Sequence, residues 1–139
     1  MIYIGIDPGT HTGMAVWDSG EGRFLSLETL PIHRAMNSVL YWNMRERNDI
    51  QVVFEDARLR KWYGRTESEV RRKIQGAGSV KRDCAIWEDY LKDYGIPFLT
   101  VKPGRVATKV TPSWFKTLTG WEGRTSEHSR DAAMLVFGR

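Results

Sequence analysis

The sequence predicts an α/β fold in which a mixed central sheet carries an antiparallel meander at one end and is flanked by helices. Three strand-like runs follow one another near the N-terminus and are separated by short turns that contain glycine. Stretches with apolar residues at helical spacing then alternate with short, mostly apolar runs. The resulting order of elements, β-β-β-α-β-α-β-α, is typical of helices packed on a mixed sheet.

The expected meander comprises residues 2–7 (IYIGID), 14–18 (MAVWD) and 24–29 (FLSLET). Consecutive strands joined by turns this short pair antiparallel with one another. Pro31 then ends the third strand. Residues 33–47 place apolar side chains at helical spacing, which predicts an amphipathic helix.

Strands and helices alternate after this first helix. Residues 50–56 (IQVVFED) form a nearly continuous apolar run, which suits a strand buried on both faces. Helical spacing then runs from Ser68 to about Tyr94, and Gly95 followed by Pro97 is a helix stop signal.

The last third of the chain is less regular. Residues 97–101 (PFLTV) predict another short strand, and residues 103–110 (PGRVATKV) predict a short helix. Residues 111–125 have no clear period, and Ser126 is the expected N-cap of a final helix over residues 127–138.

Length and composition indicate one domain spanning residues 1–139. No apolar run approaches the length of a membrane span, and Met1 leads into a strand pattern instead of a secretory signal. The single cysteine, Cys84, excludes an intramolecular disulfide and fits a reducing, cytoplasmic compartment. Because Cys84 lies in a helical pattern, we expect it to be a small buried residue.

The positive charge is concentrated in one part of the chain. Residues 58–82 contain nine basic and two acidic residues, a net charge of +7, so the rest of the chain carries −3 of the overall +4. A basic block in a weakly acidic body predicts a polyanionic partner that meets one face of the protein. A solvated helix face is the alternative interpretation.

Acidic residues end two strands of the predicted sheet and recur on the final helix. Asp7 ends the first strand, Glu55 ends the fourth, and Asp131 lies one turn beyond His128, so that these last two side chains share a helix face. If that face points at the two strand ends, all four side chains converge. The alternative is that each carboxylate has a separate local role, in a turn, at a strand end or in an ion pair.

Three converging carboxylates require a cation, because like charges in close contact disfavour ionisation. Oxygen-rich ligand sets select Mg²⁺ or Mn²⁺ over Zn²⁺. Two such ions about 4 Å apart clamp the attacking water and the leaving oxygen of a phosphodiester. His128 is then expected to be a further ligand or to position the water.

Three segments, IGIDPGTHTGMAV, VVFED and EHSRDAAML, resemble the acidic motifs of RuvC-type Holliday-junction resolvases, in particular their short phage-encoded branch. The resemblance implies a ribonuclease-H-like fold and a homodimer that nicks two strands of a four-way DNA junction in the cytoplasm of a bacterial host. It also implies Mg²⁺ as cofactor, with Mn²⁺ as a substitute. Metal ligation is carried over to Asp7, Glu55 and Asp131, and the fourth position to His128.

The resemblance extends to the segment after the second motif, ARLRKWYGR, which in similar enzymes enters the junction centre. The residues expected to meet phosphates there are Arg58, Arg60, Lys61 and Arg65, and those expected to stack on bases are Trp62 and Tyr63. Further DNA-contacting residues are expected on the following helix, namely Arg72, Lys73, Lys81 and Arg82. The glycines in residues 75–82 (QGAGSVKR) permit close approach of DNA or of a second subunit, and both interpretations remain open.

Members of this family place a cation near the scissile phosphate, before the final helix. The candidates are Lys102, Lys109, Lys116 and Arg124, and of these Lys109 is selected. The region is shorter than in cellular members, so the resemblance does not extend to a cut-site sequence preference or to a strict preference for four-way over other branched DNA.

Three other functions remain as alternatives. A ribonuclease H acting on RNA–DNA hybrids has its second carboxylate on the helix after the meander, where this chain offers only Glu46. The segment DPGTHTG also resembles the phosphate loop of actin-like and sugar-kinase ATPases, but these enzymes need two domains. A non-catalytic nucleic-acid-binding module would need only the basic block.

Overall fold

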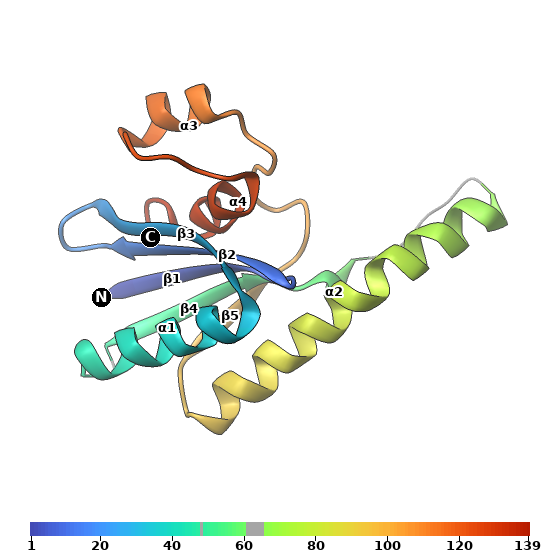
Figure 1. Cartoon of the computed structure of the whole chain (residues 1–139), viewed down its shortest axis with the longest axis horizontal. Helices are drawn as coiled ribbons and strands as arrows, with labels where there is room; N and C mark the ends of the chain where they lie inside the picture. The colour runs from blue at the N-terminus through green and yellow to red at the C-terminus, as the bar shows by residue number, and fades with distance from the viewer. Residues whose placement is uncertain (48, 61–65) are drawn as a thin grey trace.

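A five-stranded mixed sheet forms the centre of the molecule (Figure 1). The computed structural model describes the backbone of residues 1–47, 49–60 and 66–139, and their side chains except at positions 70 and 72–77. The strands are β1 (Ile2–Asp7), β2 (His11–Asp18), β3 (Arg23–Pro31), β4 (Ile50–Glu55) and β5 (Phe98–Val101). Their order across the sheet is β3-β2-β1-β4-β5.

The pairing of the strands confirms the predicted meander and its parallel extension. β1 pairs antiparallel with β2, and β2 pairs antiparallel with β3. β1 pairs in parallel with β4, and β4 pairs in parallel with β5. β1 and β4 are therefore central neighbours that run in the same direction, and their carboxyl ends lie at the same edge of the sheet.

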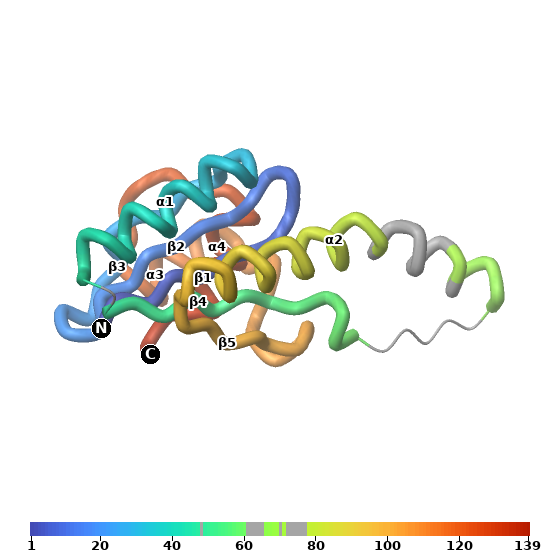
Figure 2. Tube along the Cα trace, turned by 90° about the horizontal axis from the view of Figure 1, so that it is seen from below, coloured from blue at the N-terminus to red at the C-terminus, as the bar shows by residue number. Residues whose placement is uncertain are grey.

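Helices cover both faces of this sheet. They are α1 (Ile32–Arg45), the short 3₁₀ helix η1 (Ala57–Leu59), α2 (Glu67–Asp93), α3 (Pro112–Thr119) and α4 (Glu127–Val136). In Figure 1, α1 and α2 lie on one side of the sheet and α3 and α4 on the other. Seen from below, α2 extends well beyond the edge of the sheet (Figure 2).

The alternation of side chains along β1 divides the core in two. Ile2, Ile4 and Ile6 are buried with Cys84 and other residues of α1 and α2, which confirms Cys84 as a buried residue. The alternate positions face α3 and α4, whose core cluster includes Ala15, Val53 and Ala132. Asp7 follows Gly5 by two residues and is therefore directed to the α4 face.

The predicted helix over residues 103–110 is wrong, and the prediction of no regular structure over residues 111–125 is wrong for residues 112–119. The first segment consists of turns and bends, whereas the second contains α3 and is irregular after it. Thr111 caps α3 through a hydrogen bond from the Trp114 amide, and Gly120 ends it at φ 73°. Threonine at the N-cap, proline at the first helical position and glycine after the last turn are helix boundary signals, and they do not depend on an apolar period.

The remaining differences concern where elements begin and end. β2 begins at His11 and β3 continues through Pro31, so both strands are longer than predicted. Proline is compatible with β3 because this strand lies at the edge of the sheet. No helix of the described residues is both long and apolar enough to cross a membrane.

Candidate functional site

Asp7 and Glu55 end the two central parallel strands. The register pairs Ile6 with Phe54, so the next residue of each strand, Asp7 and Glu55, lies at the same edge of the sheet. Val53 faces α4, and Glu55 follows it by two residues, so strand alternation directs both carboxylates to the α4 face. The predicted placement of these two strand ends is confirmed.

Two glycines, one on β1 and one on β2, allow α4 to pack directly on the sheet. A Cβ atom on Gly5 would lie 2.0 Å from the Ala132 carbonyl oxygen, and one on Gly13 would lie 2.0 Å from the His128 carbonyl oxygen. The Gly13 Cβ atom would also be 3.1 Å from Asp7 Cβ. The backbone of α4 therefore reaches the sheet only because both positions lack a side chain.

This close packing brings His128 to Asp7. His128 Nδ1 lies 2.9 Å from Asp7 Oδ2, although 121 residues separate the two in the chain. An ionised carboxylate only accepts hydrogen bonds, so Nδ1 is the donor. Ser126 starts α4 with a capping box that includes Ser129, and this cap sets the first turn from which His128 projects.

Asp131 shares this first part of α4 and has a different partner. The Lys109 backbone N–H donates to Asp131 Oδ1 at 2.8 Å. Lys109 has φ 53°, a left-handed conformation that costs energy in residues other than glycine. The hydrogen bond to Asp131 stabilises this conformation and places Lys109 beside the carboxylate.

The three carboxylates influence one another electrostatically. Burial raises the pKa of Asp7, the hydrogen bond of His128 lowers it, and the charge of Asp131 raises it further. Burial also raises the pKa of Glu55, as do the charges of Asp7 and Asp131. One hydrogen bond and these electrostatic effects thus connect the four side chains of the sequence prediction, which we call the acidic cluster: Asp7, Glu55, His128 and Asp131.

The donor set of the acidic cluster suits a hard divalent cation, because three of its four members offer carboxylate oxygens. Two of these oxygens already accept hydrogen bonds, from His128 and from the Lys109 amide. Within residues 1–47, 49–60 and 66–139, no three histidine, cysteine or acidic side chains are arranged as a metal-binding group. Magnesium binding therefore stays a prediction that rests on the chemistry of the donors.

A cavity of about 200 Å³ opens beside His128. It lies between the turn from Pro8 to His11 and the α2 residues Ser79 and Asp83. Asp83 is only 5% exposed. The sequence did not single out His11 and Asp83 as lining residues, because neither ends an apolar run and neither shares a helix face with another candidate.

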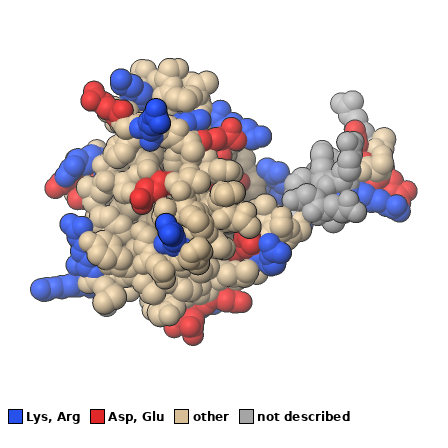
Figure 3. Space-filling view, in the orientation of Figure 1, with Lys and Arg blue, Asp and Glu red and all other residues tan. Residues whose placement is uncertain are grey.

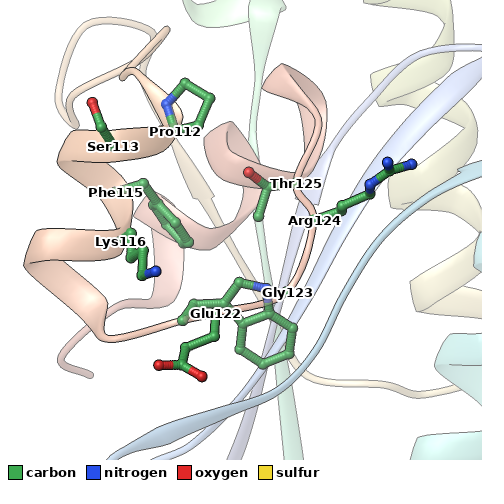
Figure 4. A pocket seen from close by; sticks show the side chains of 9 residues that line it. Pro112, Ser113, Phe115, Lys116, Glu122, Gly123, Arg124 and Thr125 are labelled. Carbon is green, nitrogen blue, oxygen red and sulfur yellow. The ribbon is translucent and has the colours of Figure 1, made fainter.

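A second cavity, of about 330 Å³, lies between α3 and the segment that leads to α4 (Figure 4). Lys116 on α3 and Arg124 on the opposite side line it. Both were alternatives to Lys109 as the expected cation near the scissile phosphate. The backbone N–H of Lys109 donates a hydrogen bond to Asp131, and the role of the Lys109 side chain stays a prediction.

Arg58, an expected phosphate-binding residue, is engaged in ion pairs within the protein. Its Nε and Nη2 donate to the two oxygens of Asp56 at 2.9 and 2.8 Å, and Nη2 also contacts Glu88 of α2. Asp56 is 3% exposed. Hydrogen bonds from Lys92 and Arg58 lower the pKa of Glu88 to about 2. Arg58 therefore joins the end of β4 to α2.

We expect Arg58→Met to lower stability by about 2 kcal/mol, because it leaves the buried Asp56 carboxylate without its main partner. The salt dependence of DNA binding should stay unchanged, whereas loss of a phosphate contact lowers the slope of log K against log salt by about 1. Arg82→Met is the matched comparison, since the Arg82 side chain is 62% exposed and its Nη2 lies 3.4 Å from Asp83. A reduced slope in the Arg58 variant would contradict the structural role.

The other expected DNA-binding residues are placed only in part. Arg60 and Arg82 are exposed, Lys81 is half-buried, and the charge of Arg60 lowers the pKa of Glu55. Lys61, Trp62, Tyr63 and Arg65, and the side chains of Arg72 and Lys73, lie outside the described residues. In the view of Figure 3, lysine and arginine alternate with acidic residues over the body of the molecule. The predicted basic face stays a prediction.

No protein-family model matches the chain, and no curated protein is similar enough in sequence to match it.

Proposed function

We propose that this protein is a magnesium-dependent, structure-selective DNA endonuclease that resolves four-way junctions by paired nicks, as a homodimer of the RuvC type. One observation carries the proposal. Asp7, Glu55, His128 and Asp131 come from two strands and a helix far apart in the chain, yet they interact at one edge of the sheet. A cluster of mutually repelling carboxylates has a cost in stability, which is typical of a functional site.

The sheet supports the ribonuclease-H-like part of the proposal. An antiparallel meander followed by two parallel strands, in the order β3-β2-β1-β4-β5 with helices on both faces, is compatible with that fold. The same arrangement favours Glu55 over Glu46 as the second carboxylate. Glu46 ends α1 shortly before β4 begins, and β4 begins beside Ile2, at the opposite edge of the sheet from Asp7.

The residues that would hold the metal are Asp7, Glu55 and Asp131, and His128 would either be a further ligand or position the water. When bound, Mg²⁺ or Mn²⁺ would lower the pKa of a water molecule and offset the charge that develops on the phosphate. His128 is oriented by its hydrogen bond to Asp7, so its Nε2 is the ring nitrogen available to position the water. The side chain of Lys109, whose backbone N–H binds Asp131, would neutralise the non-bridging phosphate oxygens.

The reaction expected from this arrangement is hydrolysis of one phosphodiester in each subunit. The water oxygen forms a bond to phosphorus while the bond from phosphorus to the 3′ oxygen breaks. The water proton passes to solvent, and the 3′ oxygen takes up a proton as it leaves. The products are a 5′-phosphate and a 3′-hydroxyl, so each nick can be ligated directly.

The test is cleavage of three labelled substrates by the purified chain: a four-way junction, a linear duplex and an RNA–DNA hybrid, each with and without Mg²⁺. We expect symmetric nicks in the junction, only with the metal present. Cleavage of the hybrid in preference to the junction would replace the proposal with a ribonuclease H activity. Junction binding without any cleavage, unchanged by Mg²⁺, would indicate a binding module.

A further inference from the structure

The segment that carries Lys109 has no regular secondary structure of its own. It joins Val101, the last residue of β5, to Pro112, the first residue of α3, through turns and bends. Val106 and Val110 pack in part against the α3/α4 core cluster. Apolar contacts of this kind hold a segment near a surface, but they are not directional and do not set where a single ammonium group lies.

Directional contacts to this segment come from two consecutive residues of α4. Asp131 Oδ1 accepts a hydrogen bond from the Lys109 N–H at 2.8 Å. Arg130 Nε donates to the Val110 carbonyl oxygen at 2.9 Å. Adjacent residues of the helix therefore bind adjacent residues of the segment, and the two contacts restrain both its position and its rotation.

Arg130 is itself buried and makes further hydrogen bonds. It is 8% exposed. Its Nη1 donates to the Thr125 carbonyl oxygen at 3.2 Å and to Thr125 Oγ1 at 2.9 Å, so the guanidinium joins the segment to the residues just before α4. These acceptors are all neutral, and hydrogen bonds from a charged donor to them are stronger than those between neutral groups.

We propose that Arg130 is a positioning residue: together with Asp131 it holds Lys109 in its left-handed conformation beside the acidic cluster. We call these two contacts, Arg130–Val110 and Asp131–Lys109, the clasp. The role of the clasp in catalysis rests on the proposed function, but its existence does not. Arg130 acts through Lys109 and contacts neither the substrate nor the metal.

The clasp is tested first on the protein alone, by amide hydrogen exchange. Arg130→Met should accelerate exchange of the Lys109 amide by at least about tenfold, because the segment loses one of its two directional contacts. Arg139→Met is the matched control, since Arg139 Nε also donates to a backbone carbonyl, that of Leu135, at the far end of the same helix. Unchanged protection of Lys109 in the Arg130 variant would overturn the proposal, whether or not the protein cleaves DNA.

Junction cleavage then separates positioning from a general structural role. Arg130→Met should lower kcat about tenfold with little change in KM, and it should have almost no further effect in a Lys109→Ala background. An equal loss of kcat in both backgrounds would overturn the positioning role. If the unmodified protein does not cleave the junction, the proposed function is wrong. The hydrogen-exchange result still shows whether the clasp holds Lys109.

A milder variant keeps the test usable if Arg130→Met does not fold. Thr125→Val has nearly the same shape and removes only the hydroxyl acceptor of Arg130. It should accelerate Lys109 exchange in the same direction by a smaller factor, about twofold to fivefold. Exchange identical to that of the unmodified protein would again contradict the clasp.

Discussion

Asp7→Asn should abolish nicking of a four-way junction, with a loss of at least about a hundredfold, because even removal of residues that only support metal ligands costs about 10–100-fold. Binding of the junction should survive or become tighter, since one negative charge that repels DNA is gone. Glu55→Gln should behave in the same way, because it ends the neighbouring parallel strand. The measurement is a cleavage time course in Mg²⁺ beside a binding titration without metal.

Stability provides an independent readout for the same variant. Burial and the charge of Asp131 raise the pKa of Asp7 in the folded protein, despite the opposing effect of the His128 hydrogen bond. The contribution of such a group is fully present below its unfolded pKa and is lost as the pH rises through the folded pKa. Ionisation of Asp7 therefore disfavours the folded state as the pH rises, and Asp7→Asn should unfold at an equal or higher temperature.

Glu21→Gln is the matched control for this prediction, because Glu21 lies in the turn between β2 and β3, at the opposite edge of the sheet. It should change neither the cleavage rate nor the unfolding temperature appreciably. Cleavage at the normal rate by Asp7→Asn would show that the acidic cluster is not the site of hydrolysis. If Asp7→Asn does not fold, cleavage by Glu55→Gln decides instead.

Gly13→Ala is expected to have the second largest effect, although Gly13 has no chemical role. The added Cβ atom would lie 2.0 Å from the His128 carbonyl oxygen, which is backbone and cannot move without the helix. We expect a loss of stability of about 1–3 kcal/mol from this overpacking. A shift of α4 by about 1 Å would also displace His128 from Asp7 and lower the cleavage rate about a hundredfold.

Denaturant unfolding and junction cleavage, both at a temperature where the variant is folded, measure the two effects of Gly13→Ala. Gly20→Ala is the control, because a Cβ atom there would be 3.3 Å from Asp18 Oδ1, the end of a side chain in an exposed turn. If Gly13→Ala cleaves the junction as fast as the unmodified protein, the close approach of α4 to β2 does not position the site.

Much of the fold could be predicted because its local signals agree. Ile2, Ile4 and Ile6 alternate with Gly5 and Asp7, and this period of two indicates a strand without any knowledge of what the strand packs against. Helix α3 was missed although Trp114, Phe115 and Leu118 recur at helical spacing, because the helix is only eight residues long and buries a single side chain, Phe115. Its boundary residues were the better evidence, because capping depends on the backbone at each end and not on what the helix packs against.

The acidic cluster could be predicted because strand ends and a helical i, i+3 pair are local properties of the sequence. Asp7 and Glu55 end apolar runs, and His128 and Asp131 share a helix face. Arg130 could not be recognised in this way. From the sequence, an arginine between His128 and Asp131 is expected to be exposed to solvent. Its contacts with Val110 and Thr125, which only the structure shows, bury it.

By itself, the sequence determined which side chains are available for chemistry and on which elements they lie, because periodicity and capping act over a few residues. The tertiary structure decided which of them meet. Gly5 and Gly13 let α4 reach the sheet, so that His128 binds Asp7 across 121 positions. The tertiary structure also pairs Arg58 with Asp56 and Glu88, so that its charge is used within the protein. Partners distant in the chain are selected by packing, and packing leaves no periodic signal along the sequence.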